Sequence, residues 1–239
     1  MNIKYKITFY SDWHCGSGLS SGADMDLLVI KDRDKLPFVP GKTIKGLLRE
    51  AVEEINELSS AGFGKEIEKV FGPNNLTETA KQVSASGSEE QINQTNASSS
   101  EEQINQANTS DSTTKTEQGR CFFTNASIEK SLGQAIKDAK LQSYLFRTIA
   151  ATALDENGVA KEHSLRKIEA TIPCELEGEI LDVPEDYVRD TDSKEVKMGE
   201  ILKNGLKFIK RLGQNRNRGL GRCSFEIIPN KKEAINENN

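Results

Sequence analysis

The stretch GADMDLLVIKDRDKLPFVPGKTIKGLLRE, residues 22–50, decides the fold, because a loop, an apolar run and a helix follow one another within it. The run LLVIK at 27–31 predicts a short buried strand. Apolar residues then recur at helical spacing, which predicts a helix over 43–57 with one face toward a core. The stretch contains GKT, but a P-loop needs a glycine where Leu36 stands, so nucleotide hydrolysis by that device is excluded.

The segments outside this stretch predict further strands and a second helix. Residues 3–10 alternate between apolar and polar side chains, as a half-buried strand does. A second helix is expected over 195–213, ended by Gly213. Further strands are expected over 120–128, over 167–183 with an interruption near Pro173, and over 222–228. The order strand, helix, strand, strand, helix, strand is typical of an α+β fold with a ferredoxin-like or RNA-recognition-motif-like core.

Residues 75–118 differ in composition from the rest of the chain. SEEQINQT at 88–95 recurs as SEEQINQA at 100–107, among Ser, Thr, Asn and Gly. Such a segment cannot bury enough apolar surface to offset its ordering entropy, so we expect a disordered acidic insertion within a single domain of residues 1–239. Residues 73–119 carry the whole net charge of −5, so the remainder of the chain sums to zero.

Composition also bounds the cellular context. No run of about 18 apolar residues is present, which excludes a membrane-spanning helix. The first ten residues lack the features of a signal peptide, so we expect a cytoplasmic protein. The four cysteines are far apart in sequence, which favours reduced, mostly buried thiols over a zinc site. They are Cys15, Cys121, Cys174 and Cys223.

The strongest local signal is GQNRNRGLGR at 213–222. Residues 201–225 hold seven basic and no acidic side chains. Glycines allow a ligand to approach the backbone closely, and arginine guanidinium groups match phosphate oxygens, so we predict contacts with a nucleic-acid phosphate backbone. The alternative is a solvated helix face followed by a flexible turn. The residues of this predicted phosphate-binding site are Arg216, Arg218, Arg222, Gly219 and Gly221.

A second basic stretch lies at the start of the helix predicted over 43–57. Residues 35–49 contain no acidic side chain and four basic ones: Lys35, Lys42, Lys45 and Arg49. Backbone N–H groups at a helix N-terminus together with nearby cations can form an anion site. We therefore predict that Lys42, Lys45 and Arg49 belong to a second anion-binding site.

These stretches together resemble the motifs of RAMP-superfamily CRISPR proteins. In that family a glycine-rich loop runs into an aspartate, a short strand and a proline-glycine turn before the first helix, as residues 22–50 do. Two later landmarks are similar: VFG at 70–72, and GRCFFTNA at 119–126 beyond the insertion. SLRKIEATIPCELEGEI at 164–180 is similar to the middle strands, and NRNRGLGR at 215–222 to the C-terminal glycine-rich loop. The resemblance implies the RAMP fold.

Within that superfamily the chain most closely resembles the repeating backbone subunits of type III effector complexes. The resemblance implies guide RNA, target RNA and the other subunits of the complex as partners, and it makes the residues of both basic stretches predicted RNA-binding residues. It also places Asp26 at the position of the aspartate that cuts target RNA in cleaving members. A carboxylate can hold a divalent ion such as Mg²⁺, or orient a ribose 2′-OH near the scissile phosphate. Asp24 is a possible auxiliary residue.

Two alternatives remain open at this point. The subunit can be a catalytically silent RNA-binding protein, with Asp26 an ordinary loop acid. It can also be a metal-independent guide-processing endoribonuclease in which His14 is the general base. His14 otherwise contacts RNA or packs on Trp13, and Trp13 itself is a core residue or a base-stacking platform. His163 is expected to be a surface or RNA-contacting residue and not a catalyst.

Overall fold

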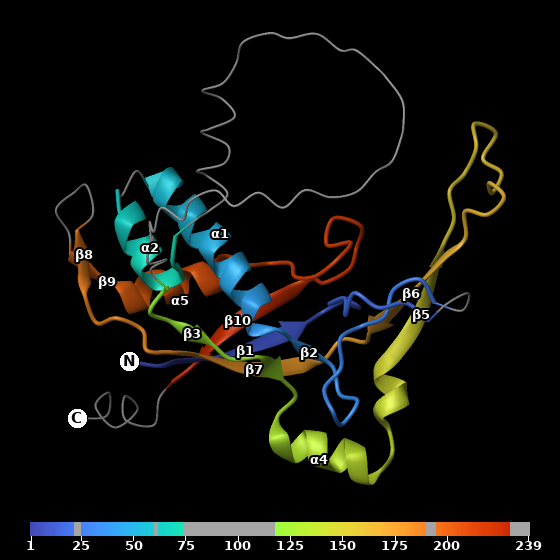
Figure 1. Cartoon of the computed structure of the whole chain (residues 1–239), viewed down its shortest axis with the longest axis horizontal. Coiled ribbons are helices and arrows are strands. Elements are labelled where there is room, and N and C mark those ends of the chain that lie inside the picture. Colours follow the sequence, from blue (N-terminus) through green and yellow to red (C-terminus); the bar gives the residue numbers. More distant parts are fainter. Residues whose placement is uncertain (22–24, 60–61, 74–117, 190–194, 230–239) are drawn as a thin grey trace, which may run out of the picture.

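The patterned segments fold into helices and antiparallel strands (Figure 1). The computed structural model describes residues 1–21, 25–59, 62–73, 118–189 and 195–229. The helices are α1 (Gly41–Ser59), α2 (Gly64–Phe71), α4 (Lys130–Asp138) and α5 (Met198–Phe208), with one 3-10 helix, η1 (Gln142–Leu145). The strands are β1 (Ile3–Phe9), β2 (Phe38–Val39), β3 (Phe122–Phe123), β4 (Ala126–Ser127), β5 (Phe146–Ala151), β6 (Arg166–Thr171), β7 (Glu175–Leu181), β8 (Tyr187–Arg189), β9 (Glu195–Lys197) and β10 (Cys223–Ile228).

The main sheet has the strand order β10-β1-β7-β4-β2, and β3 also pairs with β7. Its pairings are antiparallel. If β3 and β4 are counted together as the second strand of the pattern, β7 is the third and β10 the fourth. The order across the sheet is then fourth, first, third, second, which is the ferredoxin-like arrangement. The predicted α+β fold is confirmed.

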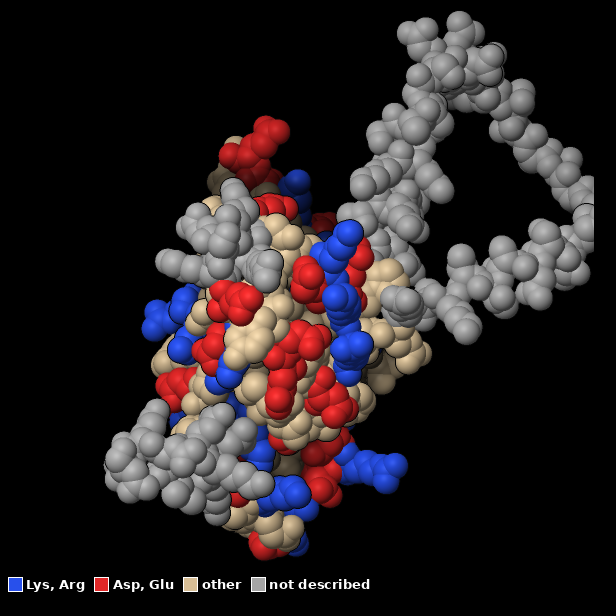
Figure 2. All heavy atoms as spheres, turned by 90° about the vertical axis from the view of Figure 1, so that its left-hand side faces the viewer, with Lys and Arg blue, Asp and Glu red and all other residues tan. Residues whose placement is uncertain are grey.

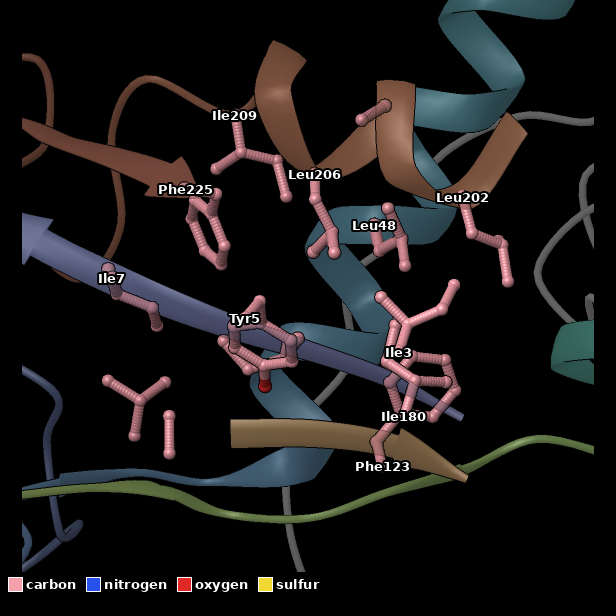
Figure 3. Packing of buried hydrophobic residues seen from close by; sticks show 14 of the residues in the cluster. Ile3, Tyr5, Ile7, Leu48, Phe123, Ile180, Leu202, Leu206, Ile209 and Phe225 are labelled. Carbon is pink, nitrogen blue, oxygen red and sulfur yellow. The ribbon is translucent and has the colours of Figure 1, made fainter. Parts of the chain in front are cut away.

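The core lies between this sheet and helices α1 and α5 (Figure 3). Alternation along β1 buries every second side chain against the helices: Ile3, Tyr5, Ile7 and Phe9. The two helices approach closely at Gly205, where a Cβ would lie 2.7 Å from Val52 Cγ2 and 2.8 Å from Leu48 Cδ1. A side chain at that position would overpack the interface between the helices.

The opposite face of the sheet is polar and mainly acidic. Its central strands pair Lys4 with Glu179 and Lys6 with Glu177. The Lys6 ammonium lies 3.4 Å from a carboxylate oxygen of Glu175. Strands β1, β7 and β10 place no aromatic ring on this face, whereas an RNA recognition motif stacks bases on aromatic residues of its central strands. The middle of this sheet is therefore not an RNA platform of that kind.

Strands β5 and β6 form a separate antiparallel hairpin that projects from the molecule (Figure 1). The free edge of β6 is lined by two earlier segments of the chain. Trp13 exchanges backbone hydrogen bonds with Thr171, and the N–H of Glu169 donates to the carbonyl of Leu27. The hairpin is thus fastened to the segments that carry His14 and Asp26.

Several predicted boundaries were wrong. Residues 27–31 form isolated bridges on the edges of other segments and not a strand. The strand expected over 120–128 is split into β3 and β4, because Thr124 turns its N–H and hydroxyl toward the carbonyl of Glu179. The helix expected over 195–213 ends at Phe208, and β9 occupies its predicted first turn. The interruption near Pro173 is confirmed, since β6 and β7 flank it.

The chain leaves and re-enters the fold at one place on either side of the predicted insertion. The N–H of Arg120 donates to the carbonyl of Lys69 at 2.9 Å, and the N–H of Cys121 donates to the carbonyl of Val70. Residues 74–117 lie outside the described residues, so the expected disorder of 75–118 stays a prediction. None of the helices within the described ranges is long and apolar enough to cross a membrane.

Candidate nucleic-acid interface

Asp26 lies at the surface beside the projecting hairpin. Its backbone N–H donates to the carbonyl of Lys167 at 2.9 Å, and its Oδ2 accepts a 2.7 Å hydrogen bond from the N–H of Lys167. The residue is exposed. The carboxylate is therefore held in place by β6 through one oxygen, while Oδ1 has no hydrogen-bond partner among the described residues. An exposed, oriented carboxylate of this kind can accept a hydrogen bond from a ribose hydroxyl.

The segment that follows Asp26 is fixed by Glu169 of β6. The Glu169 carboxylate accepts a hydrogen bond from the N–H of Val29 at 3.1 Å and forms a 2.7 Å ion pair with Lys31. Lys31 also lies 3.9 Å above the ring of Phe146 on β5. The side chain of Glu169 is 13% exposed and that of Lys31 is 31% exposed. Through Glu169 on β6 and Phe146 on β5, Lys31 ties the segment after Asp26 to both strands of the hairpin. Glu169 was not predicted as a site residue, since its role depends on Lys31, which lies 138 residues away in the sequence.

At Asp26 the described residues offer one free carboxylate oxygen, and no preformed cluster, for the predicted divalent metal. They contain no group of three or more His, Cys, Asp or Glu side chains arranged to hold an ion. Mg²⁺ is commonly bound through one or two carboxylates, with water and substrate phosphates completing its shell. The free Oδ1 of Asp26 fits that mode, in which the ion would be shared with RNA. Asp24 lies outside the described residues.

His14 is buried and held by the protein itself. Its side chain has no exposed surface, and its Nδ1 lies 2.6 Å from the carbonyl of Glu169. A Cβ at Gly16 would lie 3.1 Å from His14 Nε2, and one at Gly213 would lie 2.5 Å from the His14 carbonyl oxygen. An imidazole enclosed in this way cannot reach a 2′-OH, so the geometry does not support His14 as a general base. Its packing role is the one that the structure supports.

Trp13 and His163 occupy contrasting positions. Trp13 is fully buried, and its ring stacks on Phe9 with centroids 4.5 Å apart. It is a core residue, and the alternative of a base-stacking platform was wrong. His163 is exposed in the loop between β5 and β6 with a backbone φ of 57°, so its prediction as a surface residue is confirmed, and its contact with RNA stays a prediction.

The glycine-rich loop is a hairpin turn built on the end of the main sheet. Its stem is closed by hydrogen bonds between Leu212 and Gly221 and between Cys223 and Lys210. Gly213 and Gly221 have φ values of 97° and 70°, and a Cβ on either would collide with backbone atoms. Only glycine fits both positions. Gly219 has a φ of 93° with open space around it, so its backbone is accessible to a ligand.

The three arginines of this loop differ in their surroundings. Arg218 is exposed, and its side chain has no ion-pair partner in the described part of the chain. Arg222 is exposed as well, and its guanidinium lies 5.4 Å from the ring centroid of Tyr10. Arg216 lies 3.7 Å from Glu50 of α1, with both side chains partly exposed. The loop therefore exposes two cations, Arg218 and Arg222, and a third, Arg216, that is paired with the carboxylate of Glu50.

The second basic stretch lies on a different side of α1. Arg49 is largely buried, pairs with Glu53 at 2.8 Å and donates to the carbonyl of Gly72. It anchors α1 to the end of α2, so its inclusion among the RNA-binding residues has no support in the geometry. The first N–H of α1, at Gly41, donates to the side chain of Asn125 and is not available to an anion. Lys42 is exposed and Lys45 half-buried, and their contact with RNA stays a prediction.

Charge on the side of the molecule that carries β8, β9 and α2 is mixed. Figure 2 shows acidic and basic side chains interspersed over this face. Such a face has no extended basic field to attract an RNA backbone. Of the two basic stretches, the glycine-rich loop with Arg218 and Arg222 is the better candidate for phosphate contacts.

The four cysteines are free thiols, as predicted. Burial is the main cause that raises the pKa of Cys15 and of Cys223 to about 12. Burial likewise raises the pKa of Cys121 and of Cys174 to about 11. Thiols that stay protonated in this way are poor metal ligands and nucleophiles.

The segments that form the main sheet and the glycine-rich loop match a known protein family. A family model of the RAMP superfamily matches residues 6–224. The chain belongs to the RAMP superfamily. The predicted membership of the RAMP superfamily is thereby confirmed, and the matched residues run from β1 through the glycine-rich loop into β10.

Solved structures carry the same RAMP fold. A chain of the cryo-EM structure of type III-B Cmr-beta bound to cognate target RNA is similar with a TM-score of 0.56 at 12% identity, covering 95% of this chain and 97% of its own length. A chain of type III-B Cmr-beta in the apo state gives a TM-score of 0.50 at 14% identity, covering 96% and 98%. No curated protein sequence matches the chain. At these identities the likeness establishes the fold.

Proposed function

We propose that this RAMP protein is a guide-RNA-binding backbone subunit of a cytoplasmic type III CRISPR interference complex, and that it cleaves target RNA through Asp26. The observation that carries the proposal is the glycine-rich loop with accessible Arg218 and Arg222, on a fold shared with chains of type III-B Cmr-beta. One of those structures is bound to cognate target RNA, which makes target RNA and neighbouring subunits the natural partners.

Guide binding would rest on the loop. Guanidinium groups donate paired hydrogen bonds to phosphate oxygens, and contacts of this kind hold an RNA strand without reading its sequence. Gly219 leaves its backbone open beside Arg218, so a strand can approach closely there. Lys42 offers a further contact on another side of α1.

Cleavage would rest on Asp26. The free Oδ1 of Asp26 accepts a hydrogen bond from a ribose 2′-OH. As the ribose O2′ attacks the adjacent phosphorus, Asp26 takes up the proton of this hydroxyl. The new bond joins O2′ to phosphorus, the bond from phosphorus to the 5′ oxygen breaks, and the leaving 5′ oxygen takes a proton from solvent water. The products are a 2′,3′-cyclic phosphate and a 5′-hydroxyl. A divalent ion shared between Asp26 and RNA would offset the phosphate's charge.

The decisive variant is Asp26→Asn. The amide keeps an oxygen for the N–H of Lys167, so the loop should stay in place while the charge and the proton acceptor are lost. Every copy in the reconstituted complex should carry the variant, and labelled target RNA should be assayed with and without EDTA. We expect cleavage to fall by at least about 100-fold, the lower range for loss of a general base, while guide binding and assembly persist.

Matched variants separate this proposal from its alternatives. Asp34→Asn removes another exposed carboxylate, one that pairs with Lys137 away from the hairpin, and should leave cleavage unchanged. Cutting that survives in Asp26→Asn would remove the catalytic assignment. A complex of unsubstituted protein that binds target RNA and never cuts it would favour the silent structural subunit.

A further inference from the structure

Tyr10 is an exposed aromatic side chain that the glycine-rich loop holds in place. About half of the residue is exposed, at 52%. Its hydroxyl lies 2.8 Å from the hydroxyl of Ser224, and its backbone N–H donates to the carbonyl of Arg222. The guanidinium of Arg222 lies 5.4 Å from the ring centroid, within range of a cation–π contact. The ring is thus fixed at its hydroxyl end and accompanied by a cation.

The position of Tyr10 on the sheet distinguishes it from the rest of that face. Ser224 pairs with Thr8 on the polar face of the sheet, so the Tyr10 ring lies at the end of this face. Further along, the same face presents glutamates that would repel RNA. Next to Tyr10 lies the guanidinium of Arg222, and Arg147 of β5, whose side chain is 54% exposed, pairs with the mostly covered Asp12 two residues further along the chain. Glu175 lies opposite Thr8 on the same face and accepts hydrogen bonds from Thr8 and Lys6, so its charge is partly offset.

We infer that Tyr10 is a base-stacking platform, on which one nucleobase of a single-stranded RNA packs while Arg222 contacts an adjoining phosphate. This inference rests on the proposed RNA-binding function and adds a binding residue to it. An exposed ring next to backbone-binding cations is the arrangement by which proteins hold single strands without sequence preference. Preorganisation by Ser224 and Arg222 lowers the ordering cost of the ring on binding.

The test compares Tyr10→Ala, Tyr10→Phe and Tyr187→Ala in the full chain, by fluorescence anisotropy with a labelled single-stranded RNA. Tyr187 is the matched control, since it is 58% exposed and has Lys197 5.6 Å from its ring centroid, but lies on β8 in mixed-charge surroundings. We expect Tyr10→Ala to weaken binding by roughly five- to 150-fold, the range for one stacked base. Tyr187→Ala should bind as the unsubstituted protein does. Tyr10→Phe keeps the ring but loses the hydrogen bond to Ser224, so its affinity should fall between those of the unsubstituted protein and Tyr10→Ala.

Two further readouts separate stacking from charge. The salt dependence of affinity should be the same in Tyr10→Ala as in the unsubstituted protein, because a neutral ring releases no counterions. RNA with abasic nucleotides throughout should bind both proteins equally. Unchanged affinity of Tyr10→Ala, an equal loss in Tyr187→Ala, or a shallower salt slope would each overturn the platform. If the unsubstituted protein does not bind RNA, or if replacing the three loop arginines has no effect, the proposed function itself fails.

Discussion

The contact between Arg216 and Glu50 predicts that one carboxylate on α1 restrains RNA binding. The two side chains lie 3.7 Å apart and are 42% and 63% exposed, so the pair contributes at most about 1 kcal/mol. Arg216 must give up this partner to bind a phosphate. Glu50→Gln removes the competition, and RNA affinity should rise by between about 1.4-fold and fivefold.

The number of contacts should appear in the salt dependence. Each phosphate contact on a single strand contributes about 0.7 to the slope of log affinity against log salt. Replacing Arg216, Arg218 and Arg222 by Ala should therefore make the slope shallower by about 2. Over a roughly fourfold rise in salt concentration, the triple variant should lose about 20-fold less affinity than the unsubstituted protein.

The assay is anisotropy of labelled RNA titrated with protein at several salt concentrations. Glu54→Gln is the control, because it makes the same charge change one turn further along α1, where the described residues offer no ion-pair partner. Equal gains in Glu50→Gln and Glu54→Gln would mean that only overall charge matters. Weaker binding by Glu50→Gln would mean that the contact positions Arg216 for RNA, which would refute the reasoning.

Three other perturbations test the fold. Gly205→Ala should lower the free energy of unfolding by about 1–3 kcal/mol through overpacking between α5 and α1. Gly46→Ala, at a position of α1 with open space around it, should raise the free energy of unfolding by up to about 1 kcal/mol. Urea titration measures both changes, and equal effects of the two variants would contradict the close packing at Gly205. Replacing 78–116 with a short Gly-Ser linker should change thermal stability by about 1 kcal/mol or less, because the chain leaves and returns at one place; loss of folding would show that the segment packs. Because burial raises the pKa values of Cys15 and Cys223 to about 12, the stability they contribute should be complete below about pH 9 and decline as pH rises toward 12. Their thiols should react slowly with a disulfide reagent at about pH 8 until denaturant is added, and fast reaction in the folded protein would contradict their burial.

The sequence was informative where one face of an element meets the core. Ile44, Leu48 and Val52 are buried along α1, and they predicted that helix within two residues at each end. Strand β5 was missed because the projecting hairpin leaves none of its side chains fully buried, so no alternation marks it. Helix α4 was missed for the same reason, since only Gly133 is buried within it.

The candidate site shows the same limit. Asp26 is exposed, as the loop around it suggested. The burial of His14 depends on Glu169 and Gly213, which are far away in sequence, so no local pattern could predict it. The pairing of Arg49 with Glu53 is different, because its i,i+4 spacing was visible in the sequence. Attention to that spacing would have removed Arg49 from the predicted RNA contacts.

The burial of Trp13 gives the molecule a built-in optical reporter. It is the chain's single tryptophan, and its backbone pairs with Thr171 of the hairpin. The carbonyl of the next residue, His14, accepts a hydrogen bond from Gln214 in the glycine-rich loop. The indole thus lies at the junction between the glycine-rich loop and the β5–β6 hairpin. Its fluorescence emission should stay at short wavelength while this junction is closed, and shift to longer wavelength when water reaches the ring. Intrinsic fluorescence can therefore follow the opening of the junction without any added label.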